Sequence, residues 1–414
     1  MYRIDEKEAL RPGQKYLLVP AMLDDHFPLL KYALWSWEYR PVILENEEHI
    51  DDTGLKYVNN DMCYPCILNV GQMVEALKSG KYPLDQTCLL MPTVGDSCRG
   101  SNYISALRKG VEAAGFPQVP VVSMNLKGIE KGNCVPIHLS MAWRGLFAML
   151  YGDLLMLLVN QTRPYEREPG AAEEIRRKWV DRLSKDLRSG RHMTIRAMKH
   201  NFGLIAEEFA SLPQNGQKKQ IIGLVGDIYT KYCHLGNWDV IRFLEEYNCE
   251  AYVGGLSWYV LYYIDTHKPD GDAVLERLCV PVYGLVGKAV LSLQKSMIRQ
   301  LEQYGFHCLP DYKTQKREAE GYVSFGVCVG DGWLLGAEAV GMIKHLGRKV
   351  LAIHPFGCLP GHVCGKGWYP GMNRKLPEGR IVTVDVDSSG SRVSLYNRAK
   401  MLIDFPIKHG DQRR

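Results

Sequence analysis

Six of the twelve cysteines occupy settings in which thiolates commonly bind metal. Two of them form a C-Y-P-C pair just before a predicted helix, where both thiolates can bind one metal centre. The free N–H groups at the start of such a helix stabilise negative sulfur. The other four lie in glycine-containing loops beside predicted strands or helices, and glycine lets the backbone approach a bulky inorganic group closely. These six are Cys63, Cys66, Cys98, Cys328, Cys358 and Cys364.

The other six cysteines lack a partner at ligand spacing. They are Cys88, Cys134, Cys233, Cys249, Cys279 and Cys308. One lies inside a predicted strand, and two others lie beside apolar runs. Free cysteine is among the most buried residue types, so we expect all six to be packed or half-exposed thiols without a metal role.

Three kinds of site suit the first six cysteines: an iron–sulfur cluster, a zinc ion, or a thiol–disulfide redox pair. Structural zinc usually uses two close pairs within a small module, whereas these two pairs lie at opposite ends of the chain. A thioredoxin-like redox site would need only one βαβ unit. His362 lies between the last two cysteines, but a lone loop histidine more often faces solvent or supports a ligand. The spacing therefore favours an iron–sulfur cluster, with zinc and thiol chemistry as alternatives.

Composition points to an ordinary globular protein. The 414 residues predict about two or three domains, and 46% hydrophobic with 23% charged residues is typical of globular chains. A net charge of +5 is too small to indicate a nucleic-acid partner. The most apolar stretch, 146–159, contains Asp153 and falls short of the roughly 20 residues that span a membrane. The N-terminus has no secretory h-region. We therefore expect a cytoplasmic protein without disulfides or membrane contact.

The elements that must position the cysteines follow an alternating pattern. Short β-rich runs alternate with helical patterns through 1–137, which predicts a parallel sheet with helices on both faces. Long helices without strands are predicted over 138–215. A second α/β unit with a helical insertion near 270–304 is predicted over 216–414. The fold class is therefore α/β, with two Rossmann-like parallel-sheet domains, a helical insertion, and the cluster between the domains.

The individual predictions are as follows. Strands are predicted at 16–20, 41–45, 87–92, 119–124, 220–227, 250–255, 349–355 and 380–387, and helices at 25–36, 67–79, 101–115, 237–248 and 333–346. Ligands of open α/β sheets bind outside the carboxyl ends of the strands, and the cysteines from both halves are expected there.

Nucleotide-binding motifs are absent from the sequence. GHVCGKG at 361–367 has one residue too few between its glycines for a phosphate loop, and GLVGDIY at 223–229 lacks G-x-G-x-x-G. Neither nucleotide hydrolysis nor a nicotinamide cofactor is therefore predicted.

Four residues are candidates for contact with a small-molecule substrate. Arg99 can balance anionic sulfur or hold a carboxylate or phosphate. Trp333 and Glu338 can line a pocket, although an aromatic residue at a helix start is more often packing. His362 completes the set.

Several motifs together resemble the 2-hydroxyacyl-CoA dehydratase-like proteins, and more closely the acyl-CoA dehydratase activase-related branch. They are NDMCYPCILNVGQMVEALKSGKY, GDSCRGSNYISALRKGVEAAGFP, YGDLLMLLVNQTRPYE, GLVGDIY, GDGWLLGAEAV and PFGCLPGHVCGKG, within residues 15–405. The resemblance implies a homodimeric, cluster-bearing component that receives single electrons from a separate ATP-hydrolysing activase. That partner is an iron–sulfur protein of the actin-like fold. Other relatives, the double-cubane cluster proteins, reduce small molecules.

The sequence departs from this branch at two positions. Members commonly have one cysteine in the first motif and one in the last, whereas this chain adds Cys66 and Cys364. Four thiolates suit one 4Fe–4S cube, and six suit two cubes bridged by sulfide. We therefore expect an 8Fe–9S double-cubane cluster in a reductase of a small substrate. The alternatives are a 2-hydroxyacyl-CoA dehydratase subunit with a 4Fe–4S cluster, and a non-catalytic electron-transfer or cluster scaffold protein.

Overall fold

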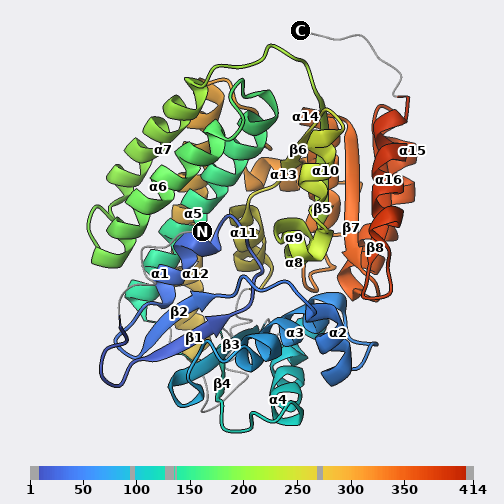
Figure 1. The fold of residues 1–414 in the computed structure, drawn as a ribbon. Coiled ribbons are helices and arrows are strands. Elements are labelled where there is room, and N and C mark those ends of the chain that lie inside the picture. The colour runs from blue at the N-terminus through green and yellow to red at the C-terminus, as the bar shows by residue number, and fades with distance from the viewer. Residues whose placement is uncertain (1–8, 94–97, 126–134, 136–137, 268–273, 407–414) are drawn as a thin grey trace.

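Two four-stranded sheets, all parallel, form the framework of the computed structural model, which describes residues 9–93, 98–125, 135, 138–267 and 274–406 (Figure 1). The first sheet has the order β2-β1-β3-β4 and the second β6-β5-β7-β8. Their strands are β1 (Lys15–Val19), β2 (Tyr39–Ile43), β3 (Thr87–Thr93), β4 (Val121–Asn125), β5 (Gln220–Gly226), β6 (Cys249–Val253), β7 (Lys349–Pro355) and β8 (Arg380–Val386). The predicted α/β class with two Rossmann-like domains is confirmed.

The first lobe, residues 9–125, surrounds the first sheet. Its helices are α1 (Phe27–Leu34), α2 (Ile50–Tyr57), α3 (Tyr64–Lys78) and α4 (Tyr103–Ala113), with 3-10 turns η2 (Leu84–Gln86) and η3 (Arg99–Asn102). The sequence pattern did not predict α2, whose eight residues include Gly54 and two aspartates. A Cβ at Gly54 would overlap the main chain at Ile67, so glycine lets α2 pack backbone to backbone against α3. That packing fixes the helix that follows Cys63.

Three long helices separate the two sheets in the chain: α5 (Leu139–Thr162), α6 (Ala171–Ser189) and α7 (Ile195–Ala210). A short turn, η4 (Arg163–Tyr165), follows α5. The segment Leu139–Tyr165 is long and apolar enough to cross a membrane by length and composition, but 72% of its most apolar window is buried inside the fold. The expectation of a buried helix is therefore confirmed.

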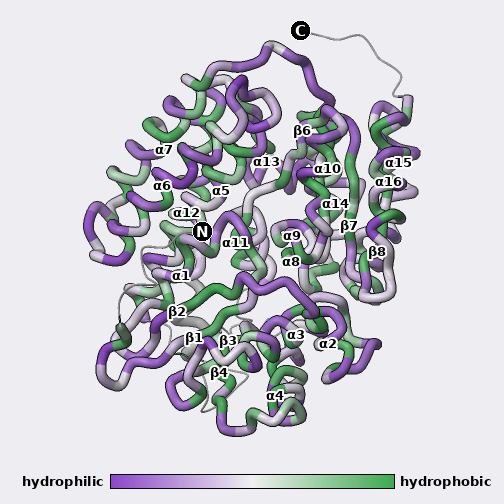
Figure 2. The backbone as a smooth tube through the Cα atoms, in the orientation of Figure 1, coloured by the Kyte–Doolittle hydropathy of each residue, from purple (hydrophilic) through white to green (hydrophobic). Residues whose placement is uncertain are grey.

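The second lobe, residues 220–406, surrounds the second sheet. Its helices are α8 (Ile228–Tyr232), α9 (His234–Asn237), α10 (Val240–Glu246), α11 (Leu256–Thr266), α12 (Val274–Gln303), α13 (Tyr312–Glu318), α14 (Leu334–His345), η5 (Gly361–Lys366), α15 (Tyr369–Lys375) and α16 (Arg392–Asp404). Helix α12 is the helical insertion predicted near 270–304, and α11 and α13, which were not predicted, lie on either side of it in the chain. Hydrophobic residues concentrate along the strands, as Figure 2 shows, and one continuous core joins the second sheet to α5, α6, α7 and α1.

A buried carboxylate joins α5 to both lobes. Asp153 of α5 has no exposed surface, and its Oδ1 lies 2.8 Å from Nε2 of His26, the residue before α1. The same carboxylate accepts the N–H groups of Leu256 and Ser257, at 2.6 and 2.9 Å, which are unpaired donors at the start of α11. The positive end of the α11 dipole also favours a negative charge there. One side chain thus fixes three helices from three parts of the chain.

Replacing Asp153 with alanine leaves two main-chain N–H groups and the His26 ring without their acceptor inside the core. We expect Asp153→Ala to lower the free energy of unfolding by about 3 to 5 kcal/mol, measured by urea unfolding. The control is Asp85→Ala at an exposed position before β3, which should change the same quantity by at most about 0.5 kcal/mol. Equal stability of the two variants would contradict this role for Asp153.

Candidate metal centre

The first cysteine pair lies at the start of α3. Cys63 is the residue before the helix and Cys66 lies in its first turn, so the helix begins earlier than the predicted start at 67. Pro65 explains the difference, because proline is favoured in the first helical turn. Both thiols are buried, and the Cys63 sulfur lies 2.5 Å from the Tyr103 hydroxyl. Burial raises the pKa of both thiols.

Two further cysteines follow strand ends, as predicted. Cys98 follows β3 and its sulfur accepts the Gly100 N–H at 3.4 Å, and Cys358 follows β7 and accepts the Gly361 N–H at 3.4 Å. Both side chains are half-buried. Burial raises the pKa of Cys98 to about 12 and that of Cys358 further still. Main-chain N–H groups directed at sulfur are one of the means by which proteins stabilise cluster ligands.

The last two cysteines flank α14 and β7. Cys328 precedes α14, and its thiol donates to the Phe325 carbonyl at 3.2 Å. Cys364 is buried within η5, a single wide π-helical turn, where the sequence predicted a loop. Such turns occur frequently at functional sites. Burial, together with the nearby charges of Asp331 and Cys328, raises the pKa of Cys364 to about 11.

Loops from the two lobes meet at these cysteines. A Cβ on Gly330 would lie 3.9 Å from the Cys98 Cβ and 2.7 Å from Pro360 Cγ, so the loop before α14 lies between them. Electrostatic interactions link several of these thiols to one another and to nearby carboxylates. Cys98 interacts with Cys63 of its own lobe and with Asp227 and Asp331 of the second lobe.

The remaining links complete one group. Cys358 interacts with Asp227, Asp331 and Cys98, and Cys364 interacts with Asp331 and Cys328. Cys63, Cys66, Cys98 and Cys358 are thus linked directly, whereas Cys328 and Cys364 are linked to them only through Asp331.

The two lobes contribute corresponding cysteines. The two sheets have the same strand order, with β5, β6, β7 and β8 in the places of β1, β2, β3 and β4. Strand β7 is therefore the counterpart of β3. Each of these strands is preceded by a helix, α3 or α14, with a cysteine at or just before its start, and is followed by a cysteine loop. Each lobe thereby supplies three thiols. No internal repeat is visible in the sequence, so this correspondence could not be predicted from it.

The donor set and its surroundings fit an iron–sulfur cluster. Desolvation keeps these thiols protonated, and buried thiolates need a cationic centre to offset their charge. A thiol–disulfide pair instead needs a lowered thiol pKa. Among the described residues, the one group of metal-ligand side chains within 4.8 Å of one another is Asp24, Cys233 and His234. No three of the six thiols form such a group among the described residues, so a single zinc ion held by three of them is not favoured.

Three charged side chains lie among the cysteines. The Arg99 guanidinium donates to the Asp61 carbonyl oxygen, which ties the Cys98 loop to the Cys63 loop, and its charge lowers the pKa of Cys63. Asp227 directly follows β5 and accepts the Thr230 N–H at 3.0 Å. Burial, followed by the charge of Asp227, raises the pKa of the half-buried Asp331 to about 8.

Two other candidate residues lie in the core of the second lobe. Trp333 is 1% exposed and packs edge-on against Tyr262 and Phe325, with ring centroids 5.1 and 4.9 Å apart. Glu338 is also 1% exposed and forms a buried ion pair with Lys231 at 2.9 Å. Packing accounts for Trp333, and charge neutralisation accounts for Glu338.

His362 lies at the edge of the cysteine group, in η5. Its Nε2 lies 3.3 Å from a carboxylate oxygen of Asp385, which also pairs with Lys366. The histidine is half-buried. These contacts direct its ring toward β8.

The cysteines expected to be ordinary thiols are packed where they are described. Cys88, Cys233 and Cys249 are buried, and Cys308 is half-buried. Cys134 and the side chain of Cys279 lie outside the described residues.

No protein-family model matches the chain, and no curated protein is significantly similar to it. The family suggested by the motifs therefore stays a prediction.

A substitution at Gly330 tests the meeting of the loops. Gly330 and Gly321 both have positive φ, +55° and +78°, so alanine costs about 1 to 2 kcal/mol at either position. Only at Gly330 does the new methyl group meet another loop. We expect Gly330→Ala to lower the iron retained per chain after anaerobic reconstitution with ferrous iron and sulfide, whereas Gly321→Ala retains the wild-type amount. Equal loss in both variants would attribute the effect to backbone strain.

Proposed function

We propose that the chain is the cluster-bearing component of an ATP-dependent reductase, located in the cytoplasm, that acts on a small molecule. An 8Fe–9S double-cubane cluster would be held by Cys63, Cys66, Cys98, Cys328, Cys358 and Cys364. The observation that carries the proposal is the contribution of three thiols by each lobe, two of them from equivalent places around β3 and β7 and a third, Cys66 or Cys364, from a neighbouring turn. Two cubes joined by sulfide would each take three thiolates, whereas one 4Fe–4S cube takes four.

The bound cluster would supply one-electron transfer at low potential. The chain's own residues hold and neutralise it. The N–H groups of Gly100 and Gly361 stabilise negative sulfur at Cys98 and Cys358, and the Arg99 guanidinium adds positive charge beside Cys63. Asp331 can hold a proton on its carboxyl oxygen near neutral pH, and its half-buried position lets it transfer that proton to a small substrate.

The electrons would come from a separate ATP-hydrolysing activase, an iron–sulfur protein of the actin-like fold, and the chain would act as a homodimer. Both parts of this proposal rest on the family resemblance. The lack of a phosphate-loop motif in the chain agrees with hydrolysis by a partner.

One observation favours an enzyme over a simple electron carrier. A carrier needs only to surround its cluster, whereas here the titratable carboxyls of Asp227 and Asp331 lie among the thiols and are reached by solvent. Proton supply beside an electron donor serves a chemical reduction rather than electron transfer alone.

Iron content tests the size of the cluster. Anaerobically purified protein should contain about eight irons and labile sulfide per chain, with an EPR signal after reduction. Cys66→Ser and Cys364→Ser should each lose about half of the iron or more, because each removes one of three thiolates from a cube. The control is Cys88→Ser, a buried cysteine inside β3, which should retain all of it.

Two other results would argue against an 8Fe–9S cluster. About four irons that persist in Cys66→Ser and Cys364→Ser would support a single cube and the dehydratase alternative. Zinc without labile sulfide would refute the iron–sulfur proposal.

Arg99 is expected to act by holding two cysteine loops together. Arg99→Ala should release iron to a chelator roughly tenfold faster than wild type, and Arg99→Lys should fall between them. Arg108→Ala is the matched control, because Arg108 also donates to a main-chain carbonyl, that of Val121 at 3.1 Å, but away from the cysteines. If iron were released at the same rate from all of these variants, Arg99 would have no role in holding the cysteine loops together.

A further inference from the structure

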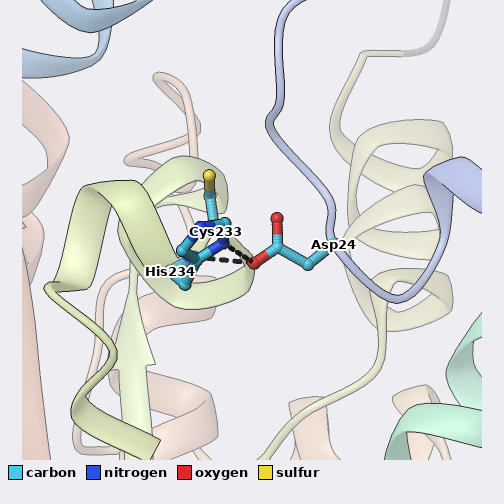
Figure 3. A group of neighbouring side chains, drawn as sticks. All are labelled: Asp24, Cys233 and His234. Carbon is cyan, nitrogen blue, oxygen red and sulfur yellow. Dashed lines mark hydrogen bonds and ion pairs between the residues drawn. The ribbon is translucent and has the colours of Figure 1, made fainter. Parts of the chain in front are cut away.

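A second set of metal-ligand atoms, which includes none of the six cysteines, lies between the lobes. Asp24, Cys233 and His234 each direct one ligand atom into a group whose members lie within 4.8 Å of one another (Figure 3). Asp24 belongs to the loop between β1 and α1 in the first lobe, whereas Cys233 and His234 join α8 to α9 in the second lobe. Any ion held by the three would connect the two lobes directly.

The histidine is oriented as a metal ligand would be. Its Nε2 lies 3.0 Å from a carboxylate oxygen of Glu47, and its Nδ1 lies 2.7 Å from Oδ2 of Asp24. Metal-binding histidines usually donate one ring N–H to a carboxylate, which leaves the other nitrogen for the ion. Here Glu47 can fix the ring, and an ion at this point would take the place of the proton between Nδ1 and the Asp24 carboxylate, beside the Cys233 sulfur.

The donor types select the metal. A thiolate, an imidazole and a carboxylate are the ligands that zinc accepts together, at about 2.0 to 2.3 Å. Alkaline-earth ions prefer oxygen alone. Cys233 is fully buried, whereas the side chains of His234 and Asp24 are 40% and 32% exposed, so a water molecule can take the fourth position.

An entry path for the ion is present. A cavity of about 820 Å³ beside β1 and β2 has Asp24, Glu47 and His234 in its wall. A smaller cavity of about 140 Å³ reaches Asp24 and His234 from the side of α5 and α10. Solvent therefore reaches the exposed side of the group, while Cys233 closes the buried side.

We propose that Asp24, Cys233 and His234 bind a zinc ion that joins the two lobes, with Glu47 positioning the histidine ring. On binding, zinc replaces the proton of the Cys233 thiol and the proton shared between His234 and Asp24, and these protons leave to solvent. The site is independent of the cysteines assigned to the iron–sulfur cluster, and of the function proposed above.

Zinc retention tests the site. Anaerobically purified holoprotein is incubated with Zn²⁺, dialysed, and assayed for zinc and iron per chain by mass spectrometry. Wild type should keep about one zinc more than His234→Asn, Asp24→Asn or Cys233→Ser, with iron unchanged in all of them. Glu47→Gln should weaken zinc binding roughly tenfold. Cys249→Ser, another buried cysteine, is the control and should keep the zinc.

Because Cys233→Ser changes the core, the partly exposed His234→Asn variant is the decisive one. Wild-type crystals should also show an anomalous peak at the zinc edge between Asp24 and His234. Equal zinc in wild type and His234→Asn, or an anomalous peak confined to the six cysteines, would overturn the proposal.

Discussion

The buried Asp153 carboxylate forms hydrogen bonds to elements of both lobes, and these contacts help to set how the lobes are placed relative to each other. It holds His26 at the start of α1, which follows β1, and the first N–H groups of α11, which follows β6. The helix that follows β1 in the first sheet and the helix that follows β6 in the second sheet are therefore both bound to α5. A carboxylate without these partners would be costly at this depth, so the contacts and the burial of α5 require one another.

The chemistry of the centre follows from where the parallel strands end. Loops at the carboxyl ends of β3 and β7 turn into helices, which places cysteine sulfur near unpaired N–H groups. Packing the loops of two lobes together removes water from the thiols, and this desolvation raises the pKa of Cys98 and Cys364. A protein gains nothing from such thiols as redox nucleophiles. A cationic centre such as the proposed cluster would offset the charge of thiolates buried beside Asp227 and Asp331.

The parts of the fold that could be predicted are those determined by the residues of the segment itself. Apolar runs identified all eight strands, and the glycine-rich surroundings of Cys98 and Cys358 marked loops at strand ends. Helix α2 could not be predicted, because its stability comes from close packing of Gly54 on α3 and not from its own sequence. The π-helical turn at Cys364 likewise depends on its surroundings. Asp24 and His234 are distant in sequence and meet only through the tertiary structure, so Cys233 was interpreted as an ordinary thiol.

The equivalence of β3 and β7 is the strongest argument that the six cysteines act together. A cysteine before the preceding helix and a cysteine after the strand occur in both lobes, although the lobes differ in their insertions and in their surrounding sequence. Packing alone gives no reason for thiols to recur at the same two places of two sheets. A centre shared by two similar halves does give that reason, because each half then presents the same ligands to its side of the centre. Cys66 and Cys364 extend this pairing, one in each lobe, and they raise the contribution of each half from two thiols to three.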